Sequence, residues 1–556
     1  MPPTIYKSDY PAPPLPTCSV FHYLFPAVDG QSPLERFDPA LPAYIDGLDG
    51  RVLTRGELRD GATRLAGGLR QLGLDREDVA LLWGVNSLEW AKAVYGCMAG
   101  GLTVSPANVA YSPKELAHQI NNSGAQIAFI DEALLDRFNE ARPLLEREFP
   151  PERVILLSKT PVAGPHRSVT EITGEPTEEF FDGERSHATA WLCYSSGTTG
   201  LPKGVETTHY NSTSELQALN VGARQIRSGH DVVLGVLPFS HIYGLGMVFL
   251  QTIAQGCPVV ILPRFQEIPA LEAIQRFRVT HALFVPPIIL TLLNSPNVRK
   301  YDLSSLETIT SGAAPLGGEI ADAFGKLLPG VTIIQAYGIT ETSPVVCTAR
   351  ADEFAARPGA VATCGKLLPN YEARLVADGV DVPAGERGEI WVRGPTVMKG
   401  YLKNREATRK AIAPGNWYQT GDIAVRDADG WYTIVDRVKE LIKYKGFQVP
   451  PAELEALLLL HPDVIDAGVV GVYDASQATE LPRAYIVARE GAETAALGRN
   501  VAAWVAAQAA NHKRLRGGVV IIDQVPKSAA GKILRKELRV RAQAELEAAR
   551  GGVANL

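Results

Sequence analysis

The stretch YSSGTTGLPKGV (residues 194–205) gathers hydroxyl groups, glycines and a lysine. Glycine lets a backbone approach a ligand closely, and hydroxyls with a lysine charge suit the oxygens of a phosphate chain. Ser, Thr and Gly also dominate ordinary solvated turns. Because the stretch follows the apolar segment AWLCY and keeps an embedded Pro-Lys-Gly, it favours phosphate binding. The predicted contacts are Ser195, Ser196, Gly197, Thr198, Thr199, Gly200 and Lys203.

The main rival motif is the P-loop, which requires G-x-x-x-x-G-K-[ST]. Counted from Gly197, Pro202 stands where the second glycine is needed, and Gly204 follows the lysine in place of Ser or Thr. No G-x-G-x-x-G follows a predicted strand, and neither H-E-x-x-H nor G-x-S-x-G occurs. The spacing therefore excludes a P-loop and gives no sign of a dinucleotide fold, a zinc protease or a serine hydrolase.

The elements that must position this stretch follow an alternating pattern. Apolar runs typical of buried parallel strands stand at 79–83, 126–130 and 153–157. Amphipathic stretches predict helices over 55–71 and 113–121, the second with a proline at its first position. Strands and helices in alternation predict α/β layers around parallel sheets.

The pattern changes from about Ile334 onward. Short β-rich pieces punctuated by glycine, at 372–376, 388–394 and 430–436, predict a smaller antiparallel subdomain. After a lysine-rich segment, helix and strand patterns resume at 450–462 and 468–473, respectively.

Composition narrows the class of function. The chain has 556 residues, too many for one core when domains average roughly 150. Its formal charge of −6 offers no general attraction to nucleic acid or anionic lipid. No apolar run reaches the roughly 18 residues of a membrane-spanning helix. We therefore expect a small-molecule substrate, with no nucleic-acid partner and no membrane span.

The cysteines and the N-terminus indicate the compartment. Six scattered cysteines without a CxxC pair predict neither a disulfide framework nor a structural zinc site, which fits a reducing compartment. The first residues, MPPTIYKSDYPAPPLP, lack the apolar core of a secretory signal. Their prolines predict an extended arm laid over a folded body.

Seven motifs in order resemble those of the acyl-adenylate-forming (ANL) superfamily, most closely its acyl-CoA synthetases of the 4-coumarate–CoA ligase type. After the glycine-rich stretch come LPFSHIYGL (237–245), SGAAPLGGE (311–319), QAYGITETSP (335–344), YQTGDIAVRDADGWYTIVDR (418–437), ELIKYKGFQVPPAELE (440–455) and PKSAAGKILRKELR (526–539). The resemblance covers about residues 40 to 540.

The resemblance implies an α/β fold in two parts. A large N-terminal AMP-binding domain (1–435) of αβ-layered subdomains plus a β-rich subdomain would be followed by a hinge (436–439) and a small mobile α+β C-terminal domain (440–556).

The implied activity is that of an acid–thiol ligase with ATP, Mg²⁺ and coenzyme A as cofactor and co-substrates. A carboxylate is a poor acyl donor, so ATP first converts it to acyl-AMP with release of pyrophosphate, and acyl-CoA and AMP follow. Two alternatives share the motifs: a stand-alone adenylation enzyme that loads a carrier protein, and a luciferase-like monooxygenase.

Several residues acquire nucleotide roles from the resemblance. Lys532 matches the adenylation lysine, Thr340 the α-phosphate contact, and Glu341 the Mg²⁺ ligand together with Thr198. Asp422 matches the acceptor of both ribose hydroxyls. Without the resemblance these would be a surface lysine, a helix N-terminal acid and a turn aspartate. The other implied contacts are Gly312, Ala313, Ala314, Gln335, Ala336, Tyr337 (stacked on adenine), Gly338, Ile434 and Arg437.

The acid is expected in an uncharged pocket. Its implied lining is His241, Tyr243, Met247, Thr310, Ala313, Ala336, Gly338 and Val345. A charged tail would be buried unpaired there, so we expect an aryl or medium-chain fatty acid. Ala336 departs from the glycine common in the family, and its methyl group narrows the pocket floor. His241 is expected to act as a gate and not as a general base, although a lone His is more often a packed core residue.

The second half-reaction requires a rearranged site. Lys439 matches the hinge position about which the C-terminal domain rotates. The residues implied in coenzyme A binding are Lys443, Lys445, Gly446, Phe447 and Gln448, with Lys443 acting in the thioester-forming pose. Composition alone would describe these lysines as a solvated basic face.

The last three residues, Ala554-Asn555-Leu556, resemble a degenerate peroxisomal tripeptide. A frayed terminus of a cytosolic enzyme is the alternative. The expected location is therefore cytoplasmic or peroxisomal.

Overall fold

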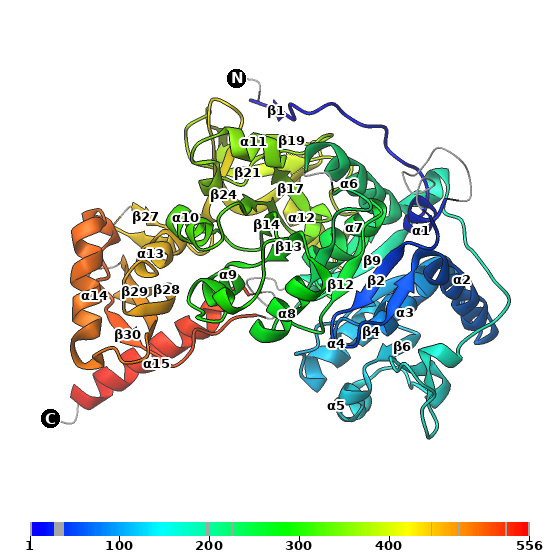
Figure 1. Ribbon diagram of the computed structural model, residues 1–556. Helices are drawn as coiled ribbons and strands as arrows, with labels where there is room; N and C mark the ends of the chain where they lie inside the picture. Colours follow the sequence, from blue (N-terminus) through cyan, green and yellow to red (C-terminus); the bar gives the residue numbers. More distant parts are fainter. Residues whose placement is uncertain are drawn as a thin grey trace.

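Two mostly parallel sheets form the body of the molecule, as the alternating pattern predicts (Figure 1). The computed structural model describes residues 3–26, 38–195, 201–223, 226–445, 447–474, 477, 479–528 and 531–553, with the backbone alone over 547–553. Among these residues no helix is long and apolar enough to cross a membrane.

The first sheet is parallel except for one antiparallel end. Its order is β22 (Gly400–Tyr401), β10 (Lys203–Thr208), β9 (Thr189–Ser195), β5 (Thr103–Pro106), β4 (Val79–Trp83), β6 (Ile127–Ile130), β7 (Val154–Leu156) and β8 (Arg167–Ser168). The pairings of β9 with β10 and of β10 with β22 are antiparallel. The three predicted strands are confirmed as β4, β6 and β7.

The second sheet is parallel apart from its last pair. Its order is β15 (Thr332–Gln335), β14 (Thr308–Ser311), β13 (His281–Phe284), β11 (Val233–Gly235), β12 (Val259–Ile261), β2 (Pro42–Asp46) and β3 (Val52–Thr54), with β2 and β3 antiparallel. Ile334 lies inside β15, so the predicted change to antiparallel structure begins slightly later, at Tyr337.

Helices pack on both sheets, and their ends follow local side-chain chemistry. α2 (Arg55–Gln71) matches its predicted bounds, and α4 (Pro113–Ser123) runs two residues further than predicted. Each begins with a capping box, in which a hydroxyl and a glutamate satisfy the first free N–H groups. The others of the N-terminal part are α1 (Val20–Leu24), α3 (Leu88–Ala99), α5 (Leu135–Ala141), α6 (His209–Gly222), α7 (Gln251–Ala254), α8 (Glu267–Phe277), α9 (Pro286–Leu293), α10 (Gly318–Leu327), α11 (Ala351–Ala356) and α12 (Arg405–Ala411).

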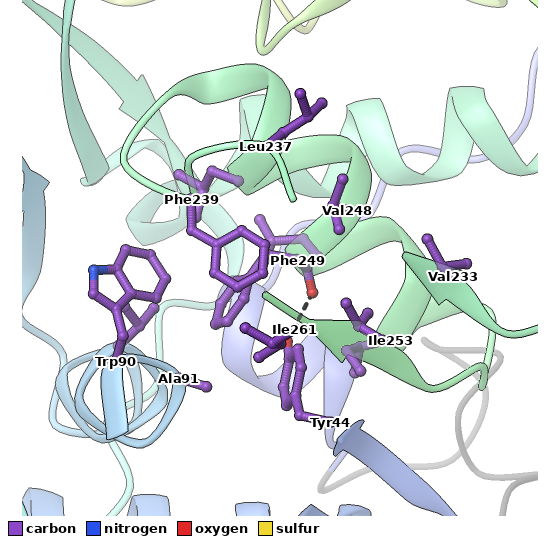
Figure 2. Close-up of a cluster of buried hydrophobic side chains, with 14 of the residues drawn as sticks. Tyr44, Trp90, Ala91, Val233, Leu237, Phe239, Val248, Phe249, Ile253 and Ile261 are labelled. Atoms are coloured by element: carbon purple, nitrogen blue, oxygen red, sulfur yellow. Dashed lines mark hydrogen bonds between the residues drawn. The ribbon is translucent and has the colours of Figure 1, made fainter. Parts of the chain in front are cut away.

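One hydrophobic core joins the two sheets. α3 contacts β4 and β5 of the first sheet and β2 of the second. In Figure 2 aromatic side chains from α3, β2 and the π-helical turn η7 (Gly244–Leu250) converge, and the Tyr44 hydroxyl donates to the Phe249 carbonyl at 2.9 Å. The Trp90 and Phe249 rings meet edge to face, 5.1 Å apart. Full burial of each such ring contributes roughly 1.5–3 kcal/mol, so this cluster fixes one sheet against the other.

A β-rich subdomain follows, as predicted. It consists of an antiparallel sheet ordered β1 (Tyr6–Lys7), β19 (Glu372–Ala377), β21 (Gly388–Arg393), β24 (Trp417–Arg426) and β23 (Ile412–Ala413), with β20 (Val380–Asp381) on β19 and β25 (Tyr432–Arg437) on β24. A second, small antiparallel sheet comes just before β19 in the sequence. It consists of β16 (Tyr337–Gly338), β17 (Val345–Thr348) and β18 (Lys366–Leu367).

The N-terminal arm runs over this subdomain, which confirms the prediction from its prolines (Figure 1). β1 pairs with β19 through Tyr6 and Lys7. The Ser8 hydroxyl donates to the Leu367 carbonyl at 2.8 Å. The arm is therefore a strand of the subdomain's sheet before the chain enters α1.

The C-terminal part forms a separate α+β unit. A hairpin of β26 (Ile442–Tyr444) and β27 (Phe447–Val449) precedes α13 (Pro451–Leu458), and a sheet of β28 (Val464–Asp474), β29 (Thr479–Ala488) and β30 (Val519–Ile521) packs with α14 (Thr494–Gln508) and α15 (Arg535–Val553). α13 is shorter than its predicted range. The N–H groups of Leu460 and His461 turn to carbonyls three residues back, because Pro462 disfavours helical backbone in the residue before it.

All six cysteines are buried and unpaired in this structure.

Candidate active site

The glycine-rich stretch is the connection of the β9–β10 hairpin. Lys203 stands opposite Ser195 in the ladder, so the two ends of the stretch lie side by side. The Lys203 ammonium lies 4.3 Å from the centroid of the Tyr401 ring. The predicted contacts Ser196, Gly197, Thr198, Thr199 and Gly200 fall outside the described residues.

Asp422 and its neighbours form a buried polar cluster at the antiparallel pair β24–β25. The Tyr337 hydroxyl donates to Asp422 Oδ2 at 2.6 Å, and Arg437 Nε lies 3.2 Å from Asp422 Oδ1. Burial and then the Asp422 charge raise the pKa of Tyr337, so its hydroxyl stays a donor. The Asp422 carboxyl group between these two residues is a hydrogen-bond acceptor suited to receive further hydroxyl donors.

Glu341 lies in the short turn η9 (Thr340–Thr342) between β16 and β17, with Thr340 beside it and half-buried. Its carboxylate Oε1 accepts a hydrogen bond from the Tyr401 hydroxyl at 2.9 Å. Within the described residues Oε2 has no hydrogen-bond partner. A carboxylate with one oxygen left for a ligand fits Mg²⁺, which is usually held by one or two carboxylates together with substrate phosphates and water.

The segment 312–316 follows β14 and leads to α10, and its backbone is held by neighbouring side chains. The Gln335 side chain donates to the Leu316 carbonyl and accepts from the Leu316 N–H, both at 2.9 Å. A Cβ on Gly312 would lie 2.9 Å from the Tyr243 ring, so only glycine fits there. Ala313 has a φ of 70°, which turns the backbone sharply before half-buried Ala314.

Lys532 enters this site from the C-terminal part. The preceding Gly531 packs on the start of α9, where an added Cβ would lie 2.9 Å from Val285 Cγ2. Burial and the nearby Arg437 lower the pKa of Lys532 to about 8, while the charges of Asp422 and Glu341 act in the opposite direction. The Lys532 ammonium is therefore within electrostatic reach of the three N-terminal residues.

His241 faces the same ammonium. Burial and then the Lys532 charge lower the pKa of His241 to about 3, so the imidazole is neutral at physiological pH. Its Nδ1 accepts from the Tyr243 N–H at 3.2 Å. A neutral ring already engaged through Nδ1 suits a positional role better than proton transfer.

The predicted acyl-pocket residues come from three adjoining pieces of chain. The Tyr243 hydroxyl donates to the Thr310 carbonyl at 3.1 Å, and the Ala336 N–H to the Ser311 carbonyl at 2.9 Å. An added Cβ on Gly338 would lie 2.2 Å from the Pro344 carbonyl oxygen, so glycine is required. The remaining members are Met247 on η7 and Val345 at the start of β17.

The residues predicted to bind coenzyme A are placed differently. Lys443, Lys445, Phe447 and Gln448 are exposed on the β26–β27 hairpin, and Lys439, the predicted hinge residue, is exposed as well. Gly446 lies outside the described residues. The structure thus brings Lys532, and not Lys443, to the Asp422 cluster. Ile434 lies on β25 beside that cluster, half-buried.

Two features of the site were not predicted from the sequence. Tyr401 contacts both Lys203 and Glu341. The only sequence signal for this role is the position of Tyr401 in the segment GYL (400–402), which follows an apolar stretch. Close to the predicted hinge, Arg535 pairs with both Glu440 and Glu455 at 2.6 Å, and burial raises the pKa of Glu455 to about 7. Asp436 accepts from the Ala452 N–H at 2.9 Å. These charges are far apart in sequence, so no local pattern reveals them.

Comparison with known proteins agrees with this geometry. The chain matches the model of the AMP-binding enzyme family over residues 35–402 and that of the AMP-binding enzyme C-terminal domain over 453–532. It is 38% identical over 514 residues to 4-coumarate-CoA ligase 1 of Narcissus pseudonarcissus, with 91% of each chain covered.

Solved structures show the same likeness. The anthranilate CoA ligase AuaEII in complex with anthranoyl-AMP has a TM-score of 0.83 and 26% identity, covering 95% of this chain and 98% of that one. The o-succinylbenzoate CoA synthetase MenE of Bacillus subtilis in complex with ATP and magnesium ion has a TM-score of 0.75 and 27% identity, covering 90% and 97%. The protein thus belongs to the AMP-binding enzyme family, within the acyl-adenylate-forming superfamily that its motifs resemble.

Proposed function

We propose that this protein is an ATP-dependent carboxylic acid–CoA ligase that acts through an acyl-adenylate on an aryl or medium-chain fatty acid with an uncharged tail. The observation that carries the proposal is that buried Lys532 lies within electrostatic reach of Arg437, Asp422 and Glu341. The C-terminal part thereby adds a cation to a nucleotide site built by the N-terminal part.

In the first half-reaction a carboxylate oxygen of the acid attacks the α-phosphorus of ATP. A new P–O bond forms, the bond from the α-phosphorus to the bridging oxygen breaks, and pyrophosphate leaves. Negative charge spreads over the phosphoryl oxygens, so positioned cations supply most of the catalysis. Lys532 and Arg437 are the cations placed for this role, and Asp422 would hold the ribose hydroxyls.

Glu341, with Thr198 of the glycine-rich stretch, would hold Mg²⁺. When bound, the ion would neutralise part of the phosphate charge. Thr340 would contact the α-phosphate and Tyr337 would stack on adenine, with Gly312 and Ala314 along the nucleotide. The bound nucleotide would thus contact side chains whose positions are already fixed by hydrogen bonds and ion pairs within the protein.

In the second half-reaction the coenzyme A sulfur attacks the acyl carbonyl carbon. The C–S bond forms, the C–O bond to AMP breaks, and the thiol proton passes to solvent. We propose that the C-terminal part (440–556) rotates about a hinge at 436–439, so that Lys443 replaces Lys532 at the site. The exposure of Lys443 and Lys439 in this structure is compatible with such a second pose.

The acid's tail follows from the uncharged lining. The two ionisable side chains of the proposed pocket, His241 and Tyr243, are both neutral, so a charged tail would lose its hydration without gaining a charged partner, at a cost on the order of several kcal/mol. Aryl and medium-chain fatty acids avoid that cost. The methyl group of Ala336 narrows the floor of the acyl pocket, which disfavours the bulkiest hydroxycinnamates.

Ala336→Gly should shift the preference toward bulkier acids. Removing one methyl group from the pocket floor should raise the ratio of kcat/KM for a hydroxycinnamate over that for benzoate by roughly 10-fold or more, since one methylene in a pocket is worth about 1–3 kcal/mol. Both acids compete in one reaction, so any change in ATP binding cancels. An unchanged ratio would place Ala336 away from the acid.

Adenylation should lose efficiency as pH rises through about 8. Lys532 has a pKa of about 8, so the ammonium that stabilises the phosphate charge is present below this pH and lost above it. The measurement is kcat/KM for ATP in acid-dependent pyrophosphate release between about pH 6 and 10. Lys532→Arg, which stays charged, should flatten the fall. A fall of the same shape in that variant contradicts the assignment.

The decisive experiment supplies a panel of acids with ATP and Mg²⁺ and follows pyrophosphate without coenzyme A, then AMP and thioester with it. The proposal expects acid-dependent pyrophosphate in the first arm and coenzyme A-dependent AMP in the second. Pyrophosphate without coenzyme A-dependent AMP favours a carrier-protein loader, and light from luciferyl-adenylate favours the monooxygenase. No pyrophosphate with any acid overturns the proposal.

We further propose a cytoplasmic or peroxisomal location, the choice depending on whether Ala554-Asn555-Leu556, which lies outside the described residues, is read as a peroxisomal address. Appending these residues to a fluorescent protein and observing its location in cells tests this. Diffuse cytoplasmic fluorescence would leave a cytoplasmic enzyme.

A further inference from the structure

We propose that Tyr401 is a positioning residue of the metal and phosphate site, in which its hydroxyl orients the Glu341 carboxylate and its ring face holds the Lys203 ammonium. This inference rests on the proposed function, because it takes Glu341 as the metal ligand and Lys203 as a phosphate contact.

The contacts of Tyr401 reach both groups at once. Its hydroxyl donates to Glu341 Oε1 at 2.9 Å, and its ring centroid lies 4.3 Å from Lys203 Nζ. Tyr401 and Glu341 are 7% and 9% exposed, so little water competes for this hydrogen bond. A cation over a shielded aromatic face is attracted to the ring's electron density. One side chain therefore fixes the distance between a carboxylate and an ammonium.

The backbone supports this arrangement. Tyr401 lies on β22, which pairs with β10 through Val205, two residues after Lys203. The Glu341 carbonyl accepts from the Met398 N–H at 2.9 Å. The segment 398–401 thus holds Glu341 by its main chain and by its side chain. η9 itself is only three residues long, so it cannot orient the carboxylate alone.

The geometry leaves one carboxylate oxygen for the metal. With Oε1 engaged by the Tyr401 hydroxyl, the plane of the carboxylate is set and Oε2 is directed elsewhere. Outer hydrogen-bond partners of this kind fix the orientation of a metal ligand, and their loss typically lowers metal affinity by about 10–100-fold. Packing is the competing role for Tyr401, but packing needs the ring and not the hydroxyl.

Tyr401→Phe separates the two roles, because it keeps the ring over Lys203 and removes only the hydroxyl. The test is Mn²⁺ binding to the protein in the presence of α,β-methylene-ATP, which cannot release pyrophosphate, measured by the loss of the free Mn²⁺ signal in electron paramagnetic resonance. We expect Mn²⁺ affinity to fall by roughly 10–100-fold, with the melting temperature close to that of the unmodified protein.

Two further variants complete the design. Tyr418→Phe removes a hydroxyl that lies 3.5 Å from that of Tyr401 and should leave Mn²⁺ affinity nearly unchanged. Tyr401→Leu removes hydroxyl and ring together, so it should also weaken metal-free nucleotide binding, by roughly 2–5-fold, as expected for a lost cation–π contact.

Unchanged Mn²⁺ affinity in Tyr401→Phe, or an equal loss in Tyr418→Phe, overturns the inference. Equal metal-free nucleotide affinity in Tyr401→Leu and Tyr401→Phe overturns its Lys203 part. These readouts need no acid and no turnover. If the unmodified protein binds Mn²⁺ with nucleotide and Tyr401→Phe does not, yet no acid yields pyrophosphate, the positioning role stands and the proposed ligase activity fails.

Discussion

Lys532→Ala should slow acyl-adenylate formation by roughly 10²–10³-fold, the loss expected when a preorganised charge-stabilising donor is removed. In this structure Lys532 is a C-terminal cation within electrostatic reach of Arg437, Asp422 and Glu341. Transfer of a preformed acyl group from acyl-AMP to coenzyme A should survive, because the proposed second pose does not use Lys532.

The two half-reactions are measured separately, as pyrophosphate release in a rapid-mixing experiment and as thioester formation from synthetic acyl-AMP. Lys443→Ala is the matched control and should show the reverse pattern, since Lys443 is exposed here and would act only after rotation. If each variant slowed both half-reactions equally, the two-pose scheme would be wrong.

Asp422→Asn should weaken AMP binding by roughly 10²-fold. Hydrogen bonds to a charged group contribute about 1.5–3 kcal/mol each, and the neutral amide accepts the two ribose hydroxyls less strongly than a carboxylate. The same change leaves Arg437 without its ion-pair partner at 3.2 Å, which adds to the loss. Isothermal titration with AMP measures the effect.

Two comparisons make the Asp422 result specific. Asp427→Asn alters a carboxylate on the turn between the same two strands, one that pairs with Arg357 at 2.6 Å, and it should leave AMP affinity nearly unchanged. The unmodified protein should discriminate AMP from 2′-deoxy-AMP, and Asp422→Asn should largely lose that discrimination. Retained discrimination in the variant would mean that the ribose is held elsewhere.

Much of the fold could be predicted from the sequence because its signals are local. Hydrophobic runs predicted β4, β6 and β7, and the Ser112–Glu115 capping box marks the start of α4. Glycine-punctuated pieces predicted the β-rich subdomain. The end of α13 was wrong by four residues, because the effect of Pro462 on the preceding turn competes with a strong run of leucines.

The site residues are a different case. Their motifs identified Lys532, Glu341 and Asp422 through family resemblance, but not which of them meet. Lys532 lies at the Asp422 cluster, whereas Lys443 does not. This difference depends on how two parts of the chain pack against each other, which no local sequence pattern encodes. The role of Tyr401 was not predicted for the same reason, since its partners Lys203 and Glu341 are remote in sequence.

The short strand β1 has a consequence for the behaviour of the protein in solution. β19 pairs with β21 along one side, and on its other side β1 covers residues 372–373 while β20 covers 376–377. An uncovered strand edge is a template for pairing with other molecules. The N-terminal residues thus cover part of the β19 edge and oppose self-association of the subdomain. We expect a protein that lacks these residues to associate with other copies through β19.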